Sequence, residues 1–249
     1  MRFIKRLFIL ACLLLTLLTW SIYEHPMAVA RVFPFLPNIT RMQLSTDTPK
    51  TVVRGSTQLL QPIPNVYVPL QEIPITLCQA VVAIEDQRFY QHKGVDFYGV
   101  ARAIFTDLTS QHAVEGASTI TQQLARNLYL SPTQTVRRKL TEALLALQLE
   151  DYYKNKGKIL ELYLNNIYYG RNAWGIKAAA TAYFGTSDVS TLSVAQCAFL
   201  AGLPQSPSYF ANNIPAALAK QKLIIQKMQA LGYLPDNFVD VLPQVLPGK

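Results

Sequence analysis

Charged side chains are scarce in this chain: only 15% of its 249 residues are Asp, Glu, Lys or Arg, whereas 50% are hydrophobic and the mean hydropathy is +0.16. This composition excludes an intrinsically disordered chain, a collagen and a coiled coil. The three cysteines are too few for the dense disulfide framework of a small secreted scaffold. The length is enough for one large domain or two small ones with a real hydrophobic core.

Acidic residues are scarcer than basic ones, with 15 Asp and Glu against 23 Lys and Arg, so the formal net charge is +8. A positively charged protein favours anionic partners, which include nucleic acids, phosphate-bearing ligands and anionic membrane surfaces. The composition alone does not choose among these three classes of partner.

The first 24 residues predict a membrane anchor. Residues 1–6 carry three positive charges, and residues 7–23 carry none. A stretch of this length is at the lower end for a membrane span, and Trp20 and Tyr23 lie where an aromatic belt would be. The positive flank predicts a cytoplasmic N-terminus and an exported remainder. The alternative is a cleaved signal peptide, because residues 28–30 (Ala-Val-Ala) resemble a small-residue cleavage site.

Export would limit which anionic partners the protein meets, and it would place the cysteines in a compartment where a disulfide can form. A domain tethered outside the cytoplasm meets lipid head groups and phosphate-linked substrates, so we expect no nucleic-acid partner. Cys78 and Cys197 would face an oxidising compartment and could form a disulfide. Both lie in apolar, helix-like surroundings, so we favour two buried free thiols.

Prolines divide the rest of the chain into two parts. Residues 24–75 hold eight of the fifteen prolines, which predicts an extended connector with one short strand or hairpin. Between residues 76 and 203 there is one proline, and the pattern becomes helical. Residues 215–232 predict an amphipathic helix that begins at Pro215 and stops at Gly232.

Two adjacent carboxylates, Glu85 and Asp86, follow an apolar run near the predicted C-terminal end of a helix. The helix dipole is negative at that end, and apolar surroundings disfavour the ionised form of a carboxyl group. Both effects predict a raised pKa for Glu85, which suits a general acid or base. The alternative is a helix that simply ends in two solvated carboxylates.

A helix start rich in hydroxyl groups follows at Ser118 and Thr119. Thr119 and Gln122 have the spacing of a capping box, and Gln123 and Arg126 come directly after it. The free N–H groups of a helix N-terminus attract anions, so this segment predicts a phosphate site. The alternative is ordinary helix capping.

Glu142 lies inside the next predicted helix, which is apolar almost all round from Leu140 and is therefore expected to be buried. Arg138 and Lys139 precede Glu142 by four and three residues, so all three can share one face. The functional interpretation is a cationic cluster that grips phosphates around a carboxylate. The alternative is a structural ion pair at the start of a helix.

Together these segments resemble the peptidoglycan glycosyltransferase family, whose members polymerise lipid II alone or as the N-terminal half of bifunctional penicillin-binding proteins. The resemblance covers about residues 60–235 and rests on five motifs in order, which makes it very specific. The motifs are Glu85-Asp86-x-x-Phe89-x-x-His92-x-Gly94-x-Asp96, Gly116-Ala117-Ser118-Thr119-Ile120-Thr121-Gln122-Gln123, Arg138-Lys139-x-x-Glu142, Ile159-Leu160-Glu161-x-Tyr163-Leu164-Asn165, and the segment from Leu192 to Pro207.

The resemblance implies a mostly α-helical, lysozyme-like domain of two lobes behind a single N-terminal transmembrane helix. We expect a cytoplasmic stub and anchor at 1–24, a Pro-rich connector at 25–70, the glycosyltransferase domain at 71–212, and a C-terminal helix and tail at 213–249. The apolar segment 97–108 is the expected membrane-facing part, and a core helix is the alternative.

The resemblance also implies residue roles. Glu85 would take the proton from the acceptor 4-hydroxyl, and Glu142 would be the second catalytic carboxylate, on the donor side; His92 would be structural. A divalent cation, Mg²⁺ or Mn²⁺, is implied, with ligands that the sequence does not identify. The implied substrate-binding residues are Asp86, Ser118, Thr119, Gln122, Gln123, Arg126, Arg138, Lys139 and Asn165.

Three positions depart from the family pattern. Gln196 stands where the family usually has Glu, which bears on packing or activity. Residues 108–115 contain no Lys or Arg, and residues 157–158 are Gly-Lys where acidic residues are common.

The expected function is the polymerisation of lipid II into glycan strands by inverting transfer of the growing chain, at the outer face of a bacterial cytoplasmic membrane. Expected partners are lipid II, the growing strand, membrane lipid and other wall-synthesis proteins. Neither Ser-x-x-Lys nor Lys-Thr-Gly, the signatures of a transpeptidase, occurs, so we expect a stand-alone transglycosylase rather than a truncated bifunctional one.

Two other functions compete with this one. A membrane-anchored glycan hydrolase could share a lysozyme-like fold, but it has no use for the cationic cluster around Glu142. A non-catalytic wall-assembly scaffold is the second, and the presence of both Glu85 and Glu142 argues against it.

Overall fold

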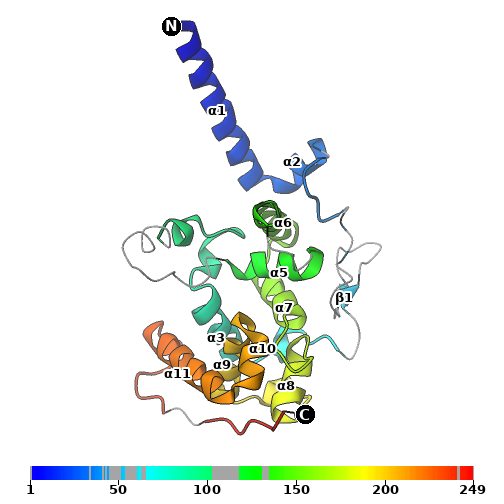
Figure 1. Ribbon diagram of the computed structural model, residues 1–249, viewed down its shortest axis with the longest axis vertical. Helices are drawn as coiled ribbons and strands as arrows, with labels where there is room; N and C mark the ends of the chain where they lie inside the picture. Colours follow the sequence, from blue (N-terminus) through cyan, green and yellow to red (C-terminus); the bar gives the residue numbers. More distant parts are fainter. Residues whose placement is uncertain are drawn as a thin grey trace.

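The computed structural model confirms a mostly helical chain (Figure 1). It describes residues 2–33, 35–40, 42, 44, 52–53, 61–62, 66–102, 118–130, 135–239 and 242–248, with the backbone alone for 2–12, 52–53 and 61–62. The expectations for the loop 108–115, and for the end of segment 97–108, lie outside these residues. The helices and strands are α1 (Arg2–Glu24), α2 (Pro26–Val32), β1 (Val52–Val53), β2 (Gln61–Pro62), α3 (Ile75–Glu85), α5 (Ile120–Tyr129), α6 (Val136–Tyr153), α7 (Lys156–Asn166), α8 (Ile176–Phe184), α9 (Val194–Gly202), α10 (Pro207–Asn212) and α11 (Ile214–Ala230), with short 3-10 turns at Leu70–Glu72, Phe89–Gln91, Val189–Thr191 and Leu203–Gln205.

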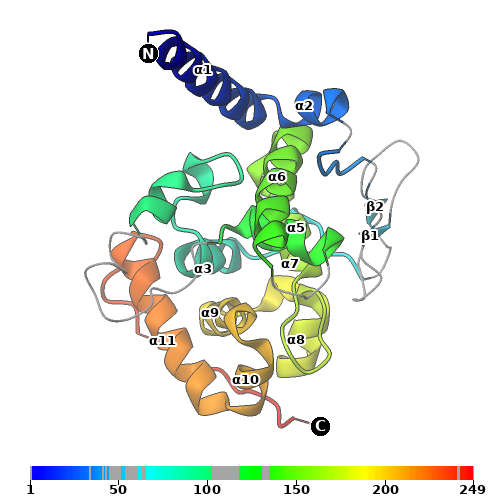
Figure 2. The same ribbon diagram turned by 45° about the horizontal axis from the view of Figure 1, so that its top comes forward.

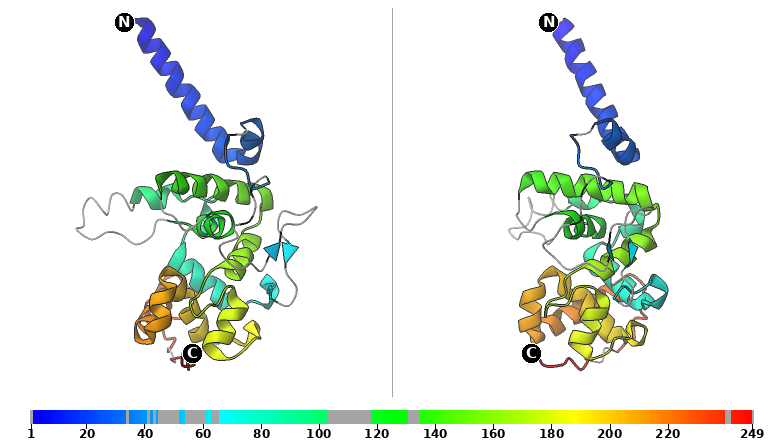
Figure 3. Two further views of the ribbon diagram at one scale, coloured as in Figure 1. Left: turned by 45° about the vertical axis from the view of Figure 1, so that its right-hand side comes forward. Right: turned by 90° about the vertical axis from the view of Figure 1, so that its right-hand side faces the viewer.

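The N-terminal helix α1 projects away from the rest of the chain (Figures 1 and 3). Only its C-terminal end touches the body: Lys93 Nζ lies 2.7 Å from Glu24 Oε2, and the rings of Tyr23 and Phe97 are 5.8 Å apart. Among the described residues, no helix combines the length and the apolarity needed to cross a membrane. The predicted membrane anchor is therefore not confirmed.

The segment predicted as an extended connector contains a helix. In α2, Pro26 occupies the first turn, where a proline costs no hydrogen bond, and Met27, Val29 and Ala30 are buried. Helix α2 packs against α6, so these apolar residues find a partner that the proline pattern did not reveal. The expected hairpin is confirmed as a minimal antiparallel pair, in which Val52 lies opposite Pro62.

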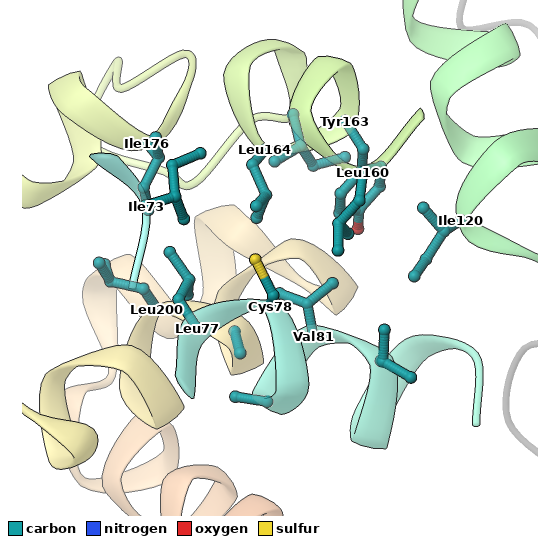
Figure 4. Packing of buried hydrophobic residues seen from close by; sticks show 14 of the residues in the cluster. Ile73, Leu77, Cys78, Val81, Ile120, Leu160, Tyr163, Leu164, Ile176 and Leu200 are labelled. Atoms are coloured by element: carbon teal, nitrogen blue, oxygen red, sulfur yellow. The ribbon is translucent and has the colours of Figure 1, made fainter. Parts of the chain in front are cut away.

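The core is built around α3, whose residues are apolar on nearly every side, as a central helix requires. Helices α9 and α11 pack against α3, and α5 packs against α6 and α7 (Figure 2). This packing fixes the C-terminal end of α3, where Glu85 is the last helical residue. Figure 4 shows the side chains of α3 and α7 that meet in the core: Leu77, Cys78, Val81, Leu160, Tyr163 and Leu164.

Two predictions about burial are resolved in different ways. Cys78 and Cys197 are free and buried, as favoured, and burial raises the pKa of Cys78 to about 12 and that of Cys197 to about 11. Such thiols are poor nucleophiles at neutral pH. Within α6, Glu142 and residues 145–150 are buried, but Val136 is 81% exposed and Leu140 is 64% exposed. The expectation that α6 is buried from Leu140 is therefore wrong for its first turns.

Glycine or proline marks several of the helix boundaries. Helix α7 ends at Asn166, and α8 begins after Gly175. Helix α11 has a proline in its first turn, and Gly232 follows it with φ of +72°. Gly94 is demanded by packing: its φ is +79°, and a Cβ there would lie 2.9 Å from the carbonyl of Ala146 in α6.

Candidate active site

A cleft of about 1120 Å³ opens at the C-terminal end of α3. One wall comes from the start of α5 and the other from α10 and α11. Six of the eleven predicted site residues line it: Glu85, Asp86, Ser118, Thr119, Gln123 and Arg126. The structure therefore brings together residues from two motifs that are more than thirty positions apart in the sequence.

Glu85 presents one paired oxygen and one unpaired oxygen. Its Oε2 accepts a hydrogen bond of 2.7 Å from Gln123 Nε2. Its Oε1 is shielded from solvent and has no hydrogen-bond partner among the described residues. Burial raises the pKa of Glu85, while the Gln123 hydrogen bond and the charges of Lys220 and Arg126 oppose that rise. The predicted direction of the shift is confirmed, and the main cause is burial.

Asp86 organises the floor of the cleft. Both of its carboxylate oxygens lie 3.0 Å from His92 Nε2, and Oδ2 also accepts a 3.2 Å hydrogen bond from the backbone N–H of Ile120. Asp86 thus ties the end of α3 to the start of α5, beside Glu85. His92 is thus held by Asp86, and the substrate-binding role that the resemblance implies for Asp86 stays a prediction.

The predicted capping box is confirmed. Thr119 Oγ1 accepts from the backbone N–H of Gln122, and Gln122 Oε1 accepts from that of Thr119, each at 3.1 Å. Thr119 Oγ1 also donates to the carbonyl of Gly94 at 2.5 Å. The polar oxygen of Gln122 is thus used within the protein, and Gln122 does not line the cleft.

Glu142 is fully buried, and both of its oxygens are occupied by cations. Arg138 Nη1 lies 2.5 Å from Oε1, and Lys139 Nζ lies 3.0 Å from Oε2. Lys139 Nζ also donates to Ser118 Oγ, which lines the cleft. Glu142 therefore holds two cations next to the start of α5 and is not itself among the residues lining the cleft.

The side chain of Asn165 is hydrogen-bonded to the protein backbone. It is fully buried; its Oδ1 accepts from the N–H of Val68, and its Nδ2 donates to the carbonyls of Val68 and Glu161, each at 2.8 Å. The side-chain amide is therefore committed to protein partners. Gln196 is explained as well: it completes a capping box with Ser193 at the start of α9, a task that Gln and Glu perform alike.

The sequence analysis did not predict the second wall of the cleft. Tyr209 of α10 and Lys220 and Lys227 of α11 line it. The signal was available, because Lys220 and Lys227 are seven residues apart on an amphipathic helix and so share one face. Helix α11 was predicted, but its face toward Glu85 was not.

The described residues do not fit a preformed metal site. Nowhere within them do three His, Cys, Asp or Glu side chains gather as metal ligands. The oxygens of Glu142 are taken by Arg138 and Lys139, and those of Asp86 by His92 and the α5 backbone. The divalent cation stays a prediction, and we derive no step through it.

Comparisons with known proteins identify the family of the chain. The Transglycosylase family model matches residues 55–229, which is most of the chain and contains the whole of the cleft described above. The chain belongs to the transglycosylase family. Penicillin-binding protein 1A of Escherichia coli is 38% identical over 96% of this chain, and a "putative transglycosylase" of Cupriavidus necator is 49% identical over 67% of it.

The relatives differ in length. The chain spans 28% of the Escherichia coli protein and 26% of penicillin-binding protein 2D of Bacillus subtilis, to which it is 47% identical over 71% of its own length. It spans 71% of the Cupriavidus necator protein. Among solved structures, penicillin-binding protein 1A of Haemophilus influenzae superposes with a TM-score of 0.38 at 19% identity, covering 68% of this chain and 16% of that one. At that score the superposition supports no statement about the fold.

Proposed function

We propose that this chain is a peptidoglycan glycosyltransferase that polymerises lipid II into glycan strands. The observation that carries the proposal is Glu85, a buried carboxyl group with one unpartnered oxygen in a cleft beside Arg126, in a chain of the transglycosylase family. A raised pKa places this carboxyl group closer to the working range of a general base than an exposed glutamate would be.

In the proposed reaction, the 4-hydroxyl of the acceptor GlcNAc gives its proton to Glu85 Oε1. The hydroxyl oxygen attacks the anomeric carbon of the donor MurNAc and forms the new glycosidic bond. The bond from that carbon to the diphosphate oxygen breaks, and the polyprenyl diphosphate leaves with the electron pair. Attack opposite the leaving group turns an α-linked donor into a β-linkage.

Cations of α5 and α6 stabilise the departing diphosphate in this proposal. Arg126 lines the cleft, and Lys139 reaches its edge through Ser118. Glu142 contributes by holding Arg138 and Lys139 in place, since its two oxygens are bound to them. Fixed cations of this kind favour the transition state because they do not have to reorganise as charge develops.

The membrane setting is part of the same proposal. Residues 7–23 carry no charge, and the end of α1 contacts the body next to Phe97 and Tyr98, which are 61% and 60% exposed. We infer an anchored protein with its lysozyme-like, two-lobed domain at the outer face of the bacterial cytoplasmic membrane, where lipid II and other wall-synthesis proteins are met. No transpeptidase activity is proposed, because its signatures do not occur.

The test is polymerisation of purified lipid II by the full chain in detergent, with and without Mg²⁺, read on a gel before and after muramidase. Wild type should give muramidase-sensitive polymer, and Glu85→Gln should lose roughly 10²- to 10⁴-fold in rate, the usual contribution of a general base. Glu72→Gln, at an exposed position outside the cleft, is the matched control and should leave the rate unchanged.

Two results would favour other functions. If the wild type binds lipid II but makes no polymer, the result favours a non-catalytic wall-assembly scaffold. If it shortens preformed glycan strands and Glu85→Gln does not, the chain is a hydrolase with the same base.

A further inference from the structure

A chain of two hydrogen bonds runs from Glu85 into the core. Gln123 Nε2 in α5 donates to Glu85 Oε2 at 2.7 Å, and the hydroxyl of Tyr163 in α7 donates to Gln123 Oε1 at 3.1 Å. Tyr163 is fully buried among core side chains (Figure 4). Gln123 is 7% exposed. These two hydrogen bonds therefore link α7 in the core, through α5, to the end of α3 at the cleft.

The groups at the two ends, Glu85 and Tyr163, set the direction in which these two hydrogen bonds are donated. An ionised carboxylate can only accept, so the amide NH₂ of Gln123 must face Glu85 and the amide oxygen must face Tyr163. Burial raises the pKa of the Tyr163 phenol well above its ordinary value, so the phenol keeps its proton and remains a donor. Without that donor, a buried amide oxygen would be left unpaired, which is costly.

We propose that Tyr163 is a positioning residue for the base: its hydroxyl holds the Gln123 amide so that Glu85 Oε2 stays occupied and Oε1 alone is left to take the substrate proton. This inference rests on the proposed function. It adds a residue that contacts neither substrate nor the carboxylate and acts only through Gln123.

Removal of the hydroxyl has a specific consequence. In Tyr163→Phe the amide oxygen of Gln123 loses its partner, and the amide is free to turn away from Glu85. The charged groups that act on Glu85 are Arg126 of α5, Lys220 of α11 and neighbouring Asp86, and all of them remain. The phenol of Tyr169 has its pKa raised by burial and by the charge of Glu85, so it keeps its proton and carries no charge. Because the lost hydrogen bond favoured the ionised carboxylate, the proton-free base then requires a higher pH.

The first experiment measures kcat/KM for lipid II polymerisation by the full chain across pH. We expect Tyr163→Phe to lose about three- to tenfold at the acid end, and little on the alkaline plateau, because one buried hydrogen bond is lost. The acid limb of the profile should move upward by about half to one pH unit. Tyr169→Phe is the matched control: it removes another fully buried phenol hydroxyl, whose bond is to Leu164, and its profile should match the wild type.

A double substitution tests whether Tyr163 acts through Gln123. Gln123→Met removes the intermediate amide at similar size, so Tyr163→Phe should have no further effect on the acid limb in that background. An unchanged profile for Tyr163→Phe alone would overturn the proposal. So would an equal loss at every pH that persists in the Gln123→Met background, since that pattern indicates damaged packing.

A substrate-free measurement separates this inference from the proposed function. The carboxyl carbon of Glu85, assigned by its disappearance in Glu85→Gln, is titrated by NMR in wild type and Tyr163→Phe. A higher midpoint in Tyr163→Phe supports the positioning role even if the wild type makes no polymer, and equal midpoints overturn it. Absence of wild-type polymer alone counts against the proposed function.

Discussion

Glu85 and Glu142 are both shielded from solvent in helices, yet the protein treats them in opposite ways. Glu85 has one oxygen bound to an uncharged amide and the other unpaired, whereas Glu142 has each oxygen bound to a cation. Burial is only partly compensated at Glu85, and the pKa of its carboxyl group is raised. At Glu142 the same kind of side chain holds two cations, whereas the environment of Glu85 suits the proton transfer that we propose for it.

Asn165 is a third buried polar residue that can be compared with Glu85 and Glu142. Its amide is saturated by three hydrogen bonds to the backbone, just as Glu142 is saturated by Arg138 and Lys139. Buried polar groups are normally paired, so a buried group left unpaired calls for an explanation. The unpaired oxygen of Glu85 differs in this respect from the polar atoms of Glu142 and Asn165, and the proposed role as a base accounts for it.

The largest expected effect on stability comes from Glu142→Gln. Loss of the carboxylate leaves Arg138 mostly buried without its counter-charge, which should lower the free energy of unfolding by about 3 kcal/mol. Chemical denaturation of the full chain in detergent measures it, with Glu72→Gln as the exposed control. Adding Arg138→Met should restore part of the loss. No loss in Glu142→Gln would mean that the cations do not depend on this carboxylate.

A smaller loss is expected for Asn165→Ala, at about 2 kcal/mol, because the N–H and C=O of Val68 lose their partner inside the protein. The comparison predicts that this variant keeps the wild-type KM for lipid II once the folded fraction is taken into account. A raised KM with unchanged stability would instead make Asn165 a substrate-binding residue, as the family resemblance implied.

The predictions that the structure confirms rest on residues that are close to one another in the sequence. Glu85 follows an apolar run at a helix end, and Thr119 and Gln122 are three residues apart, so the raised pKa and the capping box follow from neighbours in the chain. Helix α2 was not predicted, because prolines dominate its surroundings and its apolar residues pack against α6, which lies far along the sequence.

The sequence analysis could not predict contacts between segments that are far apart in the chain. Gln123 meets Glu85 across 38 positions and Tyr163 across 40, so no spacing rule could give Gln123 its place between base and core. The same holds for Lys220, whose face toward the cleft depends on how α11 packs against α3. The family resemblance implied a catalytic role for Glu142 and a substrate-binding role for Asn165, but only packing reveals that the polar atoms of both are bonded within the protein.

Glu85→Gln should change stability in the opposite direction to Glu142→Gln, and by less. The pKa of Glu85 is raised in the folded state, so the folded protein holds a proton that the unfolded chain releases, and ionisation costs stability at high pH. A neutral amide avoids that cost. The melting temperature of Glu85→Gln should therefore exceed that of the wild type at pH 8, and the gain should disappear below about pH 4, where the carboxyl group is protonated in both states. A lower melting temperature at pH 8 would mean that the ionised Glu85 is stabilised by its surroundings.

The smallest expected effect separates the two lysines at the middle of α11. Lys220 lines the cleft and lowers the pKa of Glu85 through its charge, whereas Lys222 is exposed and does not line the cleft. Lys220→Ala should therefore move the acid limb of the polymerisation profile to higher pH, and Lys222→Ala should leave it in place. Because Lys220 is partly exposed, salt screens its charge, so its shift should be smaller than that of Tyr163→Phe and should shrink further at high ionic strength. Equal profiles for the two variants would show that the second wall of the cleft does not act on the base, and Gln123 would then stand as the principal polar influence on Glu85.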